Sequence, residues 1–444
     1  MSSLPPGPRE PAALQTLRWL TAPVAFMESC RRRHGDAFSV RFLGFERPMV
    51  MLSDPRSIRA LYGSSEHGLP PGRSIALRPI MGAGSVLLLE GAEHLERRRL
   101  MLPAFHGERM RAYEPLIDEI ARAELERWPV GEPFALHPRM RALTLEVIMR
   151  AVFGISDETR LARLRELLPA LLDGTSSPAM SFRVLLARRL GRRDPLERFA
   201  TLKASIDEVL LADIAQRRGE RASAGARDIL ALLLEARFED GSAMSDRELR
   251  DQLITLLLAG HETTATALAW TFDLLLHHPP ALARLHEELR DGEDGYLRAV
   301  VSESLRLRPV LPLAGRRLER RLDAGELSLP AGTDVTPAIW LIHTRADLYP
   351  EPYAFRPERF LDGAPPPFAW IPFGGGVRRC LGAAFAELEM RAVLRAVLGR
   401  VTLAAAAPRG ESIARRNITF APRDGTRVRV TGRVSVGAAT VAAV

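Results

Sequence analysis

The stretch FGGGVRRCLG, residues 373–382, contains Cys380, one of only two cysteines in the 444-residue chain. Its three consecutive glycines indicate a backbone that takes unusual φ values or that a bulky group approaches closely. Residues 381–400 are rich in Ala and Leu and are typical of a helix, so we expect Cys380 at a helix N-terminus beside two arginines. Both features favour a thiolate over a thiol. The sequence therefore predicts that Cys380 is a nucleophile or a metal ligand.

The rest of the chain narrows the chemistry of this cysteine. Cys30 offers no resolving partner, and no nearby set of Cys and His residues has the spacing of a tetrahedral zinc site. A single axial thiolate to a haem iron fits what remains. The alternative interpretation is a glycine loop that carries a buried structural cysteine.

The same stretch resembles the haem-binding loop of the cytochromes P450, Phe-Gly-x-Gly-x-Arg-x-Cys-x-Gly, and matches it at every fixed position. The resemblance implies that Cys380 ligates the iron of haem b, iron protoporphyrin IX. It also implies that Phe373, Gly374 and Gly382 lie against the cofactor and that Arg378 binds a propionate.

Length and composition are compatible with one large domain. No linker divides residues 1–444, although the small-residue tail at 434–444 is expected to fray. Two cysteines provide no disulfide framework and suit a reducing compartment. We find no signal peptide or apolar run of membrane-spanning length. The Pro-rich residues 4–8 resemble the hinge that follows the anchor of membrane-bound P450s, without an anchor before it. The resemblance implies a soluble, cytoplasmic, monomeric enzyme of the bacterial type.

The predicted fold is mainly α with small β-sheets, an α+β class. Apolar residues recur at helical spacing through most of 112–238, whereas residues 37–54 predict two strands with a turn near Gly44. A second hairpin is predicted around Asp424-Gly425. The resemblance implies the P450 fold, in which a long central helix covers one haem face and the Cys loop the proximal face.

A central helix of about 30 residues is predicted to begin after Ser245, with Glu248 at the capping-box spacing, and to end near His277. Its apolar face is interrupted at residues 259–264, AGHETT, where a glycine and an acid–Thr pair cost helix stability. This interruption resembles the oxygen-binding groove of P450s. The resemblance implies that Ala259 and Gly260 adjoin the haem and that Glu262 and Thr263 relay protons during dioxygen activation. The alternative is a simple helix kink.

Further basic and acidic residues match positions that support the haem in the family. His94 and Arg98 are four residues apart on one face of a predicted helix, and with Arg316 (rather than Arg317) and Arg378 they would hold the propionates. Glu303 and Arg306 share a helix face, and Arg359 lies in a Pro-Glu-Arg-Phe segment. The resemblance implies a structural network of these last three residues beneath the Cys loop. In isolation, either set is more often a solvated charged face.

The substrate pocket and the partners are inferred only from the resemblance and the charge pattern. Irregular loops at 64–90 and 174–195 are expected to set substrate choice. The net charge of +8 comes mostly from arginines spread along helices, which favours an acidic protein partner over nucleic acid. We expect a ferredoxin or flavodoxin with its NAD(P)H reductase to dock on Arg97, Arg99, Arg379, Arg391 and Arg395. The residues expected to line the pocket are Val86, Ala259, Thr263, Val310, Leu311 and Leu313.

Together these resemblances predict a haem-thiolate monooxygenase. It would insert one oxygen atom of O2 into an apolar substrate, by hydroxylation or epoxidation of a fatty acid, terpenoid or polyketide-like compound. One alternative is a haem-thiolate isomerase or peroxygenase, which the Glu262-Thr263 pair disfavours. Another is a non-enzymatic haem sensor. A third is a thiol hydrolase that uses Cys380, for which no His–Asx signature is present.

Overall fold

The computed structural model describes residues 4–63, 67–68, 78–105, 107–155, 157–175, 195–219, 228–363, 365–416 and 418–434. Residues 64–66 and 69–77 of the loop expected to set substrate choice at 64–90 lie outside the described residues. Residues 176–194 of the second loop and the tail from 435 onward also lie outside them.

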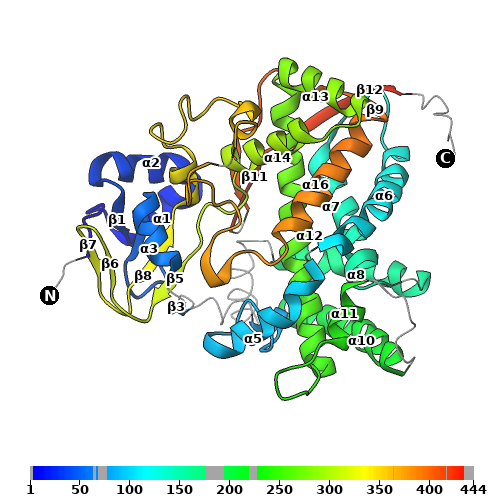
Figure 1. Cartoon of the computed structure of the whole chain (residues 1–444), viewed down its shortest axis with the longest axis horizontal. Helices are drawn as coiled ribbons and strands as arrows, with labels where there is room; N and C mark the ends of the chain where they lie inside the picture. Colours follow the sequence, from blue (N-terminus) through cyan, green and yellow to red (C-terminus); the bar gives the residue numbers. More distant parts are fainter. Residues whose placement is uncertain are drawn as a thin grey trace.

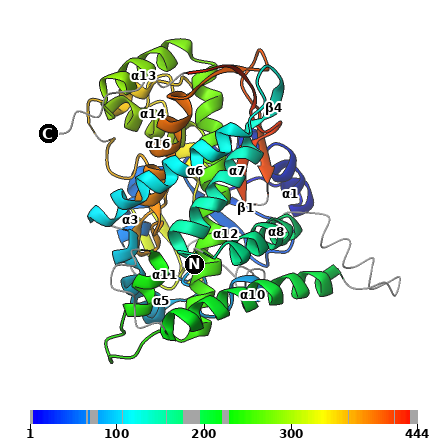
Figure 2. The same ribbon diagram turned by 90° about the vertical axis from the view of Figure 1, so that its right-hand side faces the viewer.

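The helix α12, Asp246–Leu276, passes through the middle of the helical part of the molecule (Figures 1 and 2). Its start confirms the predicted capping box, because the Ser245 hydroxyl accepts from the Glu248 N–H and the Glu248 side chain accepts from the Ser245 N–H. α12 is buried along most of its length, packing against α7 on one side and α16 on the other. It is therefore the scaffold on which the other helices are arranged.

The remaining helices form around α12 because their apolar faces converge on one large core cluster. Short 3-10 turns and one π-helical turn connect several of them. The helices on this side are α5 Gly91–Met101, η1 Leu102–Phe105, η2 Gly107–Tyr113, α6 Glu114–Glu126, α7 Leu136–Val147, η3 Ile148–Val152, α8 Glu158–Thr175, α10 Pro195–Gly219, α11 Ile229–Glu235, α13 Pro279–Asp291, α14 Gly295–Leu307, η4 Pro357–Phe360, η5 Gly376–Arg378 and α16 Ala383–Leu398.

A smaller β-rich part lies on the left of Figure 1. Its five-stranded sheet has the order β1-β2-β8-β5-β3, and the predicted first hairpin is confirmed by the antiparallel pairing of β1 with β2. Two small apolar clusters, separate from the large core, pack against this sheet. The elements here are α1 Ala12–Thr21, α2 Pro23–His34, β1 Ala37–Val40, β2 Met49–Leu52, α3 Pro55–Gly63, β3 His67–Gly68, β5 Arg316–Leu318, β6 Leu322–Ala324, β7 Leu327–Leu329, β8 Asp334–Pro337 and α15 Ile339–His343.

The predicted hairpin around Asp424-Gly425 is wrong. Strand β11, Thr419–Pro422, pairs with β10, Ile413–Arg416, so the hairpin turn lies before β11. Strand β12, Arg427–Arg433, instead pairs with β9, Val401–Ala405, and with β4, Pro133–Ala135. Asp424-Gly425 is therefore a connection between two sheets, a choice that long-range pairing makes and local turn chemistry does not reveal.

The fold is mainly helical with small sheets, as predicted. Among the helices of the described part, none has both the length and the apolar character that crossing a membrane requires.

Candidate active site

The loop before Cys380 is shaped by its glycines. Gly374 and Gly376 have φ values of +68° and +63°, which L-residues with a Cβ rarely adopt. A Cβ on Gly375 would overlap the ring of Tyr62, and one on Gly376 would lie 2.8 Å from the Tyr62 carbonyl oxygen. The Cys380 N–H then donates to the Phe373 carbonyl at 2.9 Å, which closes the loop. The three glycines therefore let the loop turn tightly against α3.

Cys380 is open to solvent on one side and enclosed by protein on the others. Desolvation raises the pKa of its thiol, although the Gly382 N–H and the nearby Arg98 and Arg379 act in the opposite direction. In the protein alone, enclosure thus outweighs the helix N-terminus and the arginines that the sequence suggested would favour the thiolate. A bound metal cation reverses this balance, because a coordinating thiol is deprotonated outright.

Two predicted residues of α12 share an open face. Ala259 is exposed, Thr263 is half-buried, and the Thr263 hydroxyl donates to the Ala259 carbonyl at 2.6 Å. Gly260 has a different neighbour, because a Cβ there would lie 2.8 Å from Cδ1 of Ile148 in η3. A larger residue at this position would therefore press on Ile148, and the expectation that Gly260 adjoins the haem stays a prediction.

Glu262 points toward α7 rather than toward Thr263. Its carboxylate forms an ion pair with Arg141 at 2.7 Å and lies 3.8 Å from Nε2 of His137. Burial, together with Arg416, Arg141 and His261, lowers the pKa of His137 to about 3, so this histidine is neutral. The carboxylate therefore has the partner that its interior position demands.

Four predicted basic residues gather on one side of the Cys loop. Burial lowers the pKa of His94 to about 4, and the three charged groups that act on it most, Arg378, Arg98 and Arg316, are all cations. His94 and Arg316 are almost fully buried. The Tyr62 hydroxyl lies buried near Arg316 without a hydrogen-bond partner among the described residues. Such a concentration of desolvated cations fits a dicarboxylate ligand.

The contacts of these cations hold them around the loop. Arg98 donates to the Arg379 carbonyl at 2.7 Å, and Arg378 donates to the Leu89 carbonyl at 2.6 Å. Arg317 instead forms a bidentate pair with Asp334, at 2.8 Å for each bond. Because consecutive strand residues face opposite sides, Arg316 is the member of this pair that lies with the basic group.

Beneath the loop, the structure brings together the predicted trio of Glu303, Arg306 and Arg359. The Arg306 guanidinium makes two bonds to the Glu303 carboxylate, at 2.6 and 2.7 Å, and both side chains are fully buried. Arg359 lies 3.4 Å from the same carboxylate. Arg306 also donates to the carbonyls of His343, Pro352 and Ala354. A buried ion pair of this kind is tolerated because every bond of the guanidinium is directed to an acceptor.

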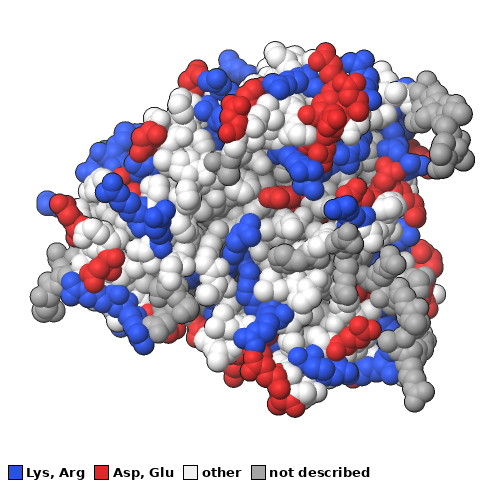
Figure 3. Space-filling model, viewed as in Figure 1, with Lys and Arg blue, Asp and Glu red and all other residues white. Residues whose placement is uncertain are grey.

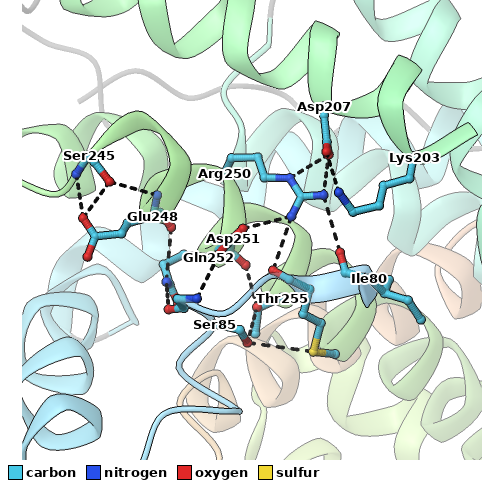
Figure 4. A network of polar contacts seen from close by, with 12 residues as sticks. Ile80, Ser85, Lys203, Asp207, Ser245, Glu248, Arg250, Asp251, Gln252 and Thr255 are labelled. Atoms are coloured by element: carbon cyan, nitrogen blue, oxygen red, sulfur yellow. Dashed lines mark hydrogen bonds and ion pairs between the residues drawn. The ribbon is translucent and has the colours of Figure 1, made fainter. Parts of the chain in front are cut away.

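A second network of polar contacts, called the dock below, joins the first turns of α12 to the segment at residues 80–86 (Figure 4). The Gln252 amide accepts from the Val86 N–H at 3.0 Å and donates to the Gly84 carbonyl at 2.6 Å. Asp251 accepts from the Gly84 N–H at 2.9 Å, and Thr255 donates to the Ser85 hydroxyl at 2.7 Å. Arg250 joins this dock to Asp207 of α10. The sequence did not indicate this dock, because the contacts between α12 and residues 84–86 join residues more than 160 positions apart.

The predicted pocket residues divide between different parts of the core. Val86 and Val310 belong to the large cluster around α12, and Leu311 is half-buried. Leu313 instead packs against the cluster beneath the β-rich part, beside strand β1. All six residues thus remain pocket predictions, and Leu313 in addition packs beneath the β-rich part.

Comparison with known proteins agrees with this arrangement. A family model described as Cytochrome P450 matches residues 5–409. The chain belongs to the cytochrome P450 family. A protein named cytochrome P450 135B1 from Mycobacterium tuberculosis is 41% identical over 99% of this chain and 94% of its own length. Cytochrome P450 137 from the same organism is 41% identical over 90% of this chain and 83% of its own length.

Solved structures show the same P450 fold. A retinoic-acid-bound cyanobacterial CYP120A1 matches with a TM-score of 0.83 and 27% identity, covering 98% of this chain and 100% of that one. The haem domain of cytochrome P450DA matches with a TM-score of 0.81 at 24% identity, which supports the fold alone. This P450 is therefore a haem-thiolate monooxygenase whose cofactor is iron protoporphyrin IX.

The site fits that cofactor. Cys380 provides an open sulfur, and the basic group of His94, Arg98, Arg316 and Arg378 provides for two propionates. Sequence reasoning did not identify Arg141, which pairs with Glu262, or the buried His343, which lies against Arg306. Neither belongs to a local motif, so only the assembled fold reveals them.

The predicted basic docking face needs one correction. Arg97 is buried, pairs with Glu248 and stacks over Phe238 with 5.2 Å between its guanidinium carbon and the ring centroid. It therefore supports the fold and does not belong to an exposed face. Arg379 and Arg395 are exposed, and Arg391 is half-buried. On the face of the molecule that Figure 3 views, basic side chains lie along the middle, between the regions where Figure 1 draws α16 and α5.

Proposed function

We propose that this P450 inserts one oxygen atom of O2 into an apolar substrate, a fatty acid, terpenoid or polyketide-like compound. The product is a hydroxyl or an epoxide, and the second oxygen atom leaves as water. The observation that carries the proposal is the open Cys380 thiol, which lies among desolvated cations and rests on the buried Glu303–Arg306 pair. The enzyme is proposed to act as a cytoplasmic monomer.

Bound haem supplies the redox chemistry of dioxygen activation and oxygen insertion. The protein's own residues perform three tasks around it. Cys380 would hold the iron through its sulfur, which is open on one side and desolvated where the protein encloses it. His94, Arg98, Arg316 and Arg378 would hold the propionates through charge-assisted bonds. The open face of α12 at Ala259 and Thr263 borders the space for dioxygen and substrate.

Thr263 and Glu262 are proposed to deliver protons. The Thr263 hydroxyl donates to the Ala259 carbonyl, so its oxygen lone pairs stay available to accept a proton from a bound water. Glu262 lies on the α7 side, where Arg141 holds its carboxylate. Transfer between them therefore requires Glu262 to turn away from Arg141 or a water to bridge them. Either way, protons enter from the α7 side of the helix.

Apolar substrate chemistry is supported by Val86 and Val310, which both belong to the large apolar cluster around α12. Val86 is fixed by the Gln252 amide, and Val310 belongs to the same apolar cluster. The solved relative with bound retinoic acid also holds an apolar molecule that ends in a carboxylate. The test is to screen fatty acids, terpenoids and polyketide-like compounds for a spectral shift of the ferric protein. Products formed under isotopically labelled O2 are then analysed.

Incorporation of labelled oxygen from O2 into a product supports the proposal. Turnover only with added peroxide, and none with reductase plus O2, contradicts it in favour of a peroxygenase. A rearranged product without new oxygen contradicts it in favour of an isomerase.

Electrons are proposed to come from a separate ferredoxin or flavodoxin with its NAD(P)H reductase. A cleft of about 290 Å³ lies where α16 meets α14 and η2. Its charged lining consists of four arginines and two acids, which leaves a surplus of positive charge that complements an acidic partner. The charged residues are Arg111, Glu114, Asp294, Arg298, Arg391 and Arg395.

The docking proposal is tested with Arg395→Glu, and Arg321→Glu on the exposed β6 side serves as the control. We expect Arg395→Glu to slow reduction by an acidic ferredoxin severalfold at low salt and less at high salt. Arg321→Glu should leave the rate unchanged. Equal rates for both variants contradict this docking site.

A further inference from the structure

His343, the last residue of α15, is a fully buried histidine in which both ring nitrogens bond to backbone groups. Its Nε2 lies 2.9 Å from the Ile371 N–H, which can only donate, so Nε2 accepts. Its Nδ1 lies 3.1 Å from the Arg306 carbonyl, which can only accept, so Nδ1 carries the proton. The two backbone partners therefore fix one neutral tautomer.

The His343 ring thus forms a bridge between Arg306 and Ile371. One end of this bridge is the buried ion-pair network of Glu303 and Arg306. The Arg306 guanidinium donates to the His343 carbonyl at 2.8 Å, while the His343 ring donates to the Arg306 carbonyl. The two residues thus hold each other through reciprocal side-chain-to-backbone bonds. Because Arg306 is also held by Glu303, this end of the bridge is rigid.

The other end of the His343 bridge leads to the loop that carries Cys380. The Ile371 N–H is held by His343, and the Ile371 carbonyl accepts from the Gly374 N–H at 2.9 Å. Phe373, between these two residues, accepts from the Cys380 N–H at 2.9 Å. A short chain of backbone bonds therefore joins the imidazole to the residue that carries the sulfur.

The two residues before Ile371 are also anchored. The Tyr349 hydroxyl donates to the Ala369 carbonyl at 3.0 Å, and the Trp370 indole donates to the Ser302 carbonyl at 3.1 Å. His343 holds the residue nearest the glycine turn. An aliphatic side chain could occupy its volume, but it would leave the Ile371 N–H and the Arg306 carbonyl buried without these partners.

We propose that His343 is a positioning residue, which fixes the start of the Cys380 loop on the Glu303–Arg306 network and so keeps the sulfur directed at the iron. This inference rests on the proposed haem-thiolate site. Burial and the neighbouring Arg306 lower the pKa of His343 to about 3, which keeps its accepting nitrogen free of a proton near neutral pH.

The test compares the holoprotein with His343→Leu, His343→Asn and Leu164→Ala. Leu164 is fully buried in α8, away from the loop, and its truncation serves as a destabilising control. The readouts are the ratio of thiol-ligated to thiolate-ligated haem in the ferrous carbonyl complex and the reduction potential of the iron. A purely structural loss of stability leaves both unchanged in the molecules that remain folded.

We expect His343→Leu to raise the thiol-to-thiolate ratio by roughly tenfold and to shift the potential. His343→Asn, which keeps a donor and an acceptor, should recover part of the wild-type ratio, and Leu164→Ala should match wild type. If His343→Leu does not fold, His343→Asn decides, because an intermediate ratio supports the proposal.

Wild-type ratio and potential in a folded His343→Leu overturn the proposal. If His343→Leu cannot be obtained folded, a wild-type thiol-to-thiolate ratio in His343→Asn also overturns the proposal. A wild-type protein that shows no thiolate-ligated haem contradicts the proposed function itself, and this outcome is distinct from the failure of His343.

Discussion

The support beneath Cys380 and the dock beneath Val86 both use an arginine paired with carboxylates, but they differ in access to water. Glu303 and Arg306 have side chains with 0% exposure. In the dock, Arg250 is buried and pairs with Asp207 and Asp251, whose side chains are 21% and 7% exposed, so only Asp207 is open to water. A missing partner can be replaced by water in the dock but not in the support. We therefore infer that the support beneath Cys380 is fixed, whereas the dock beneath Val86 can rearrange.

The largest effect is expected from Arg306→Leu. Removing this guanidinium leaves the Glu303 carboxylate buried with its main partner gone, which costs about 3–5 kcal/mol in the free energy of unfolding. The same change frees the carbonyls of His343, Pro352 and Ala354. We expect poor haem retention, measured from the Soret absorbance per protein, and a much lower denaturation midpoint. Haem retention and a midpoint close to wild type would contradict the role of this pair as a permanent support.

A smaller effect is expected from Arg250→Leu in the dock. Asp207 keeps Lys203 as a partner at 2.6 Å, so we expect a loss of about 1–3 kcal/mol in the free energy of unfolding. Because the segment that carries Val86 loses a tether, substrate-induced spectral shifts should weaken while the thiolate-ligated spectrum remains. Lys203→Met is the matched control, since it removes a cation from the same carboxylate without touching the segment. Loss of the thiolate-ligated spectrum in Arg250→Leu would contradict the proposed difference between the dock beneath Val86 and the support beneath Cys380.

Lowering the pH tests the surroundings of Cys380 and of Glu262, because a buried histidine lies in each of them. The pKa of His343 on the proximal side and of His137 beside Glu262 is lowered to about 3 in each case, chiefly by burial. An unfolded histidine titrates near ~6.5, so the folded state binds fewer protons below that pH. Their contribution to stability is complete above ~6.5 and is lost as the pH falls toward about 3. Urea titrations between these pH values should therefore show a shallower pH dependence in His343→Asn and in His137→Asn. An unchanged slope in both variants contradicts the neutral buried state.

The smallest effect on stability and the most specific effect on chemistry are expected from Thr263→Val. Among the described residues, the hydroxyl bonds to carbonyls of its own helix turn alone, so its loss should change the free energy of unfolding by less than about 0.5 kcal/mol. Proton delivery should suffer, with product formed per O2 consumed falling by about tenfold or more and peroxide rising. Product yield and peroxide are measured in the same reaction. Unchanged coupling would show that protons reach the site without this hydroxyl.

Local sequence patterns were enough for several of these elements. The capping box of α12 and the Glu303–Arg306 spacing depend on neighbours within a few residues, so their motifs carry the structural information. The family resemblance also favoured Arg316 over Arg317, whose guanidinium is bound by Asp334.

Contacts between distant segments could not be read in this way. Nothing near Arg97 in sequence shows that Glu248 buries it, and nothing near Gly260 shows that Ile148 packs against it. The direction of the shift in the Cys380 pKa also depended on enclosure by several segments, which outweighs the local arginines. His343 could not be singled out from the sequence, because its two backbone partners lie 37 and 28 positions away.

The central claim, that Cys380 ligates the haem iron as a thiolate, is tested most directly by the spectrum of the ferrous carbonyl complex. Wild type should show the long-wavelength Soret band that gives the family its name, and Cys380→His should bind haem without that band. Survival of the band in Cys380→His would contradict the account.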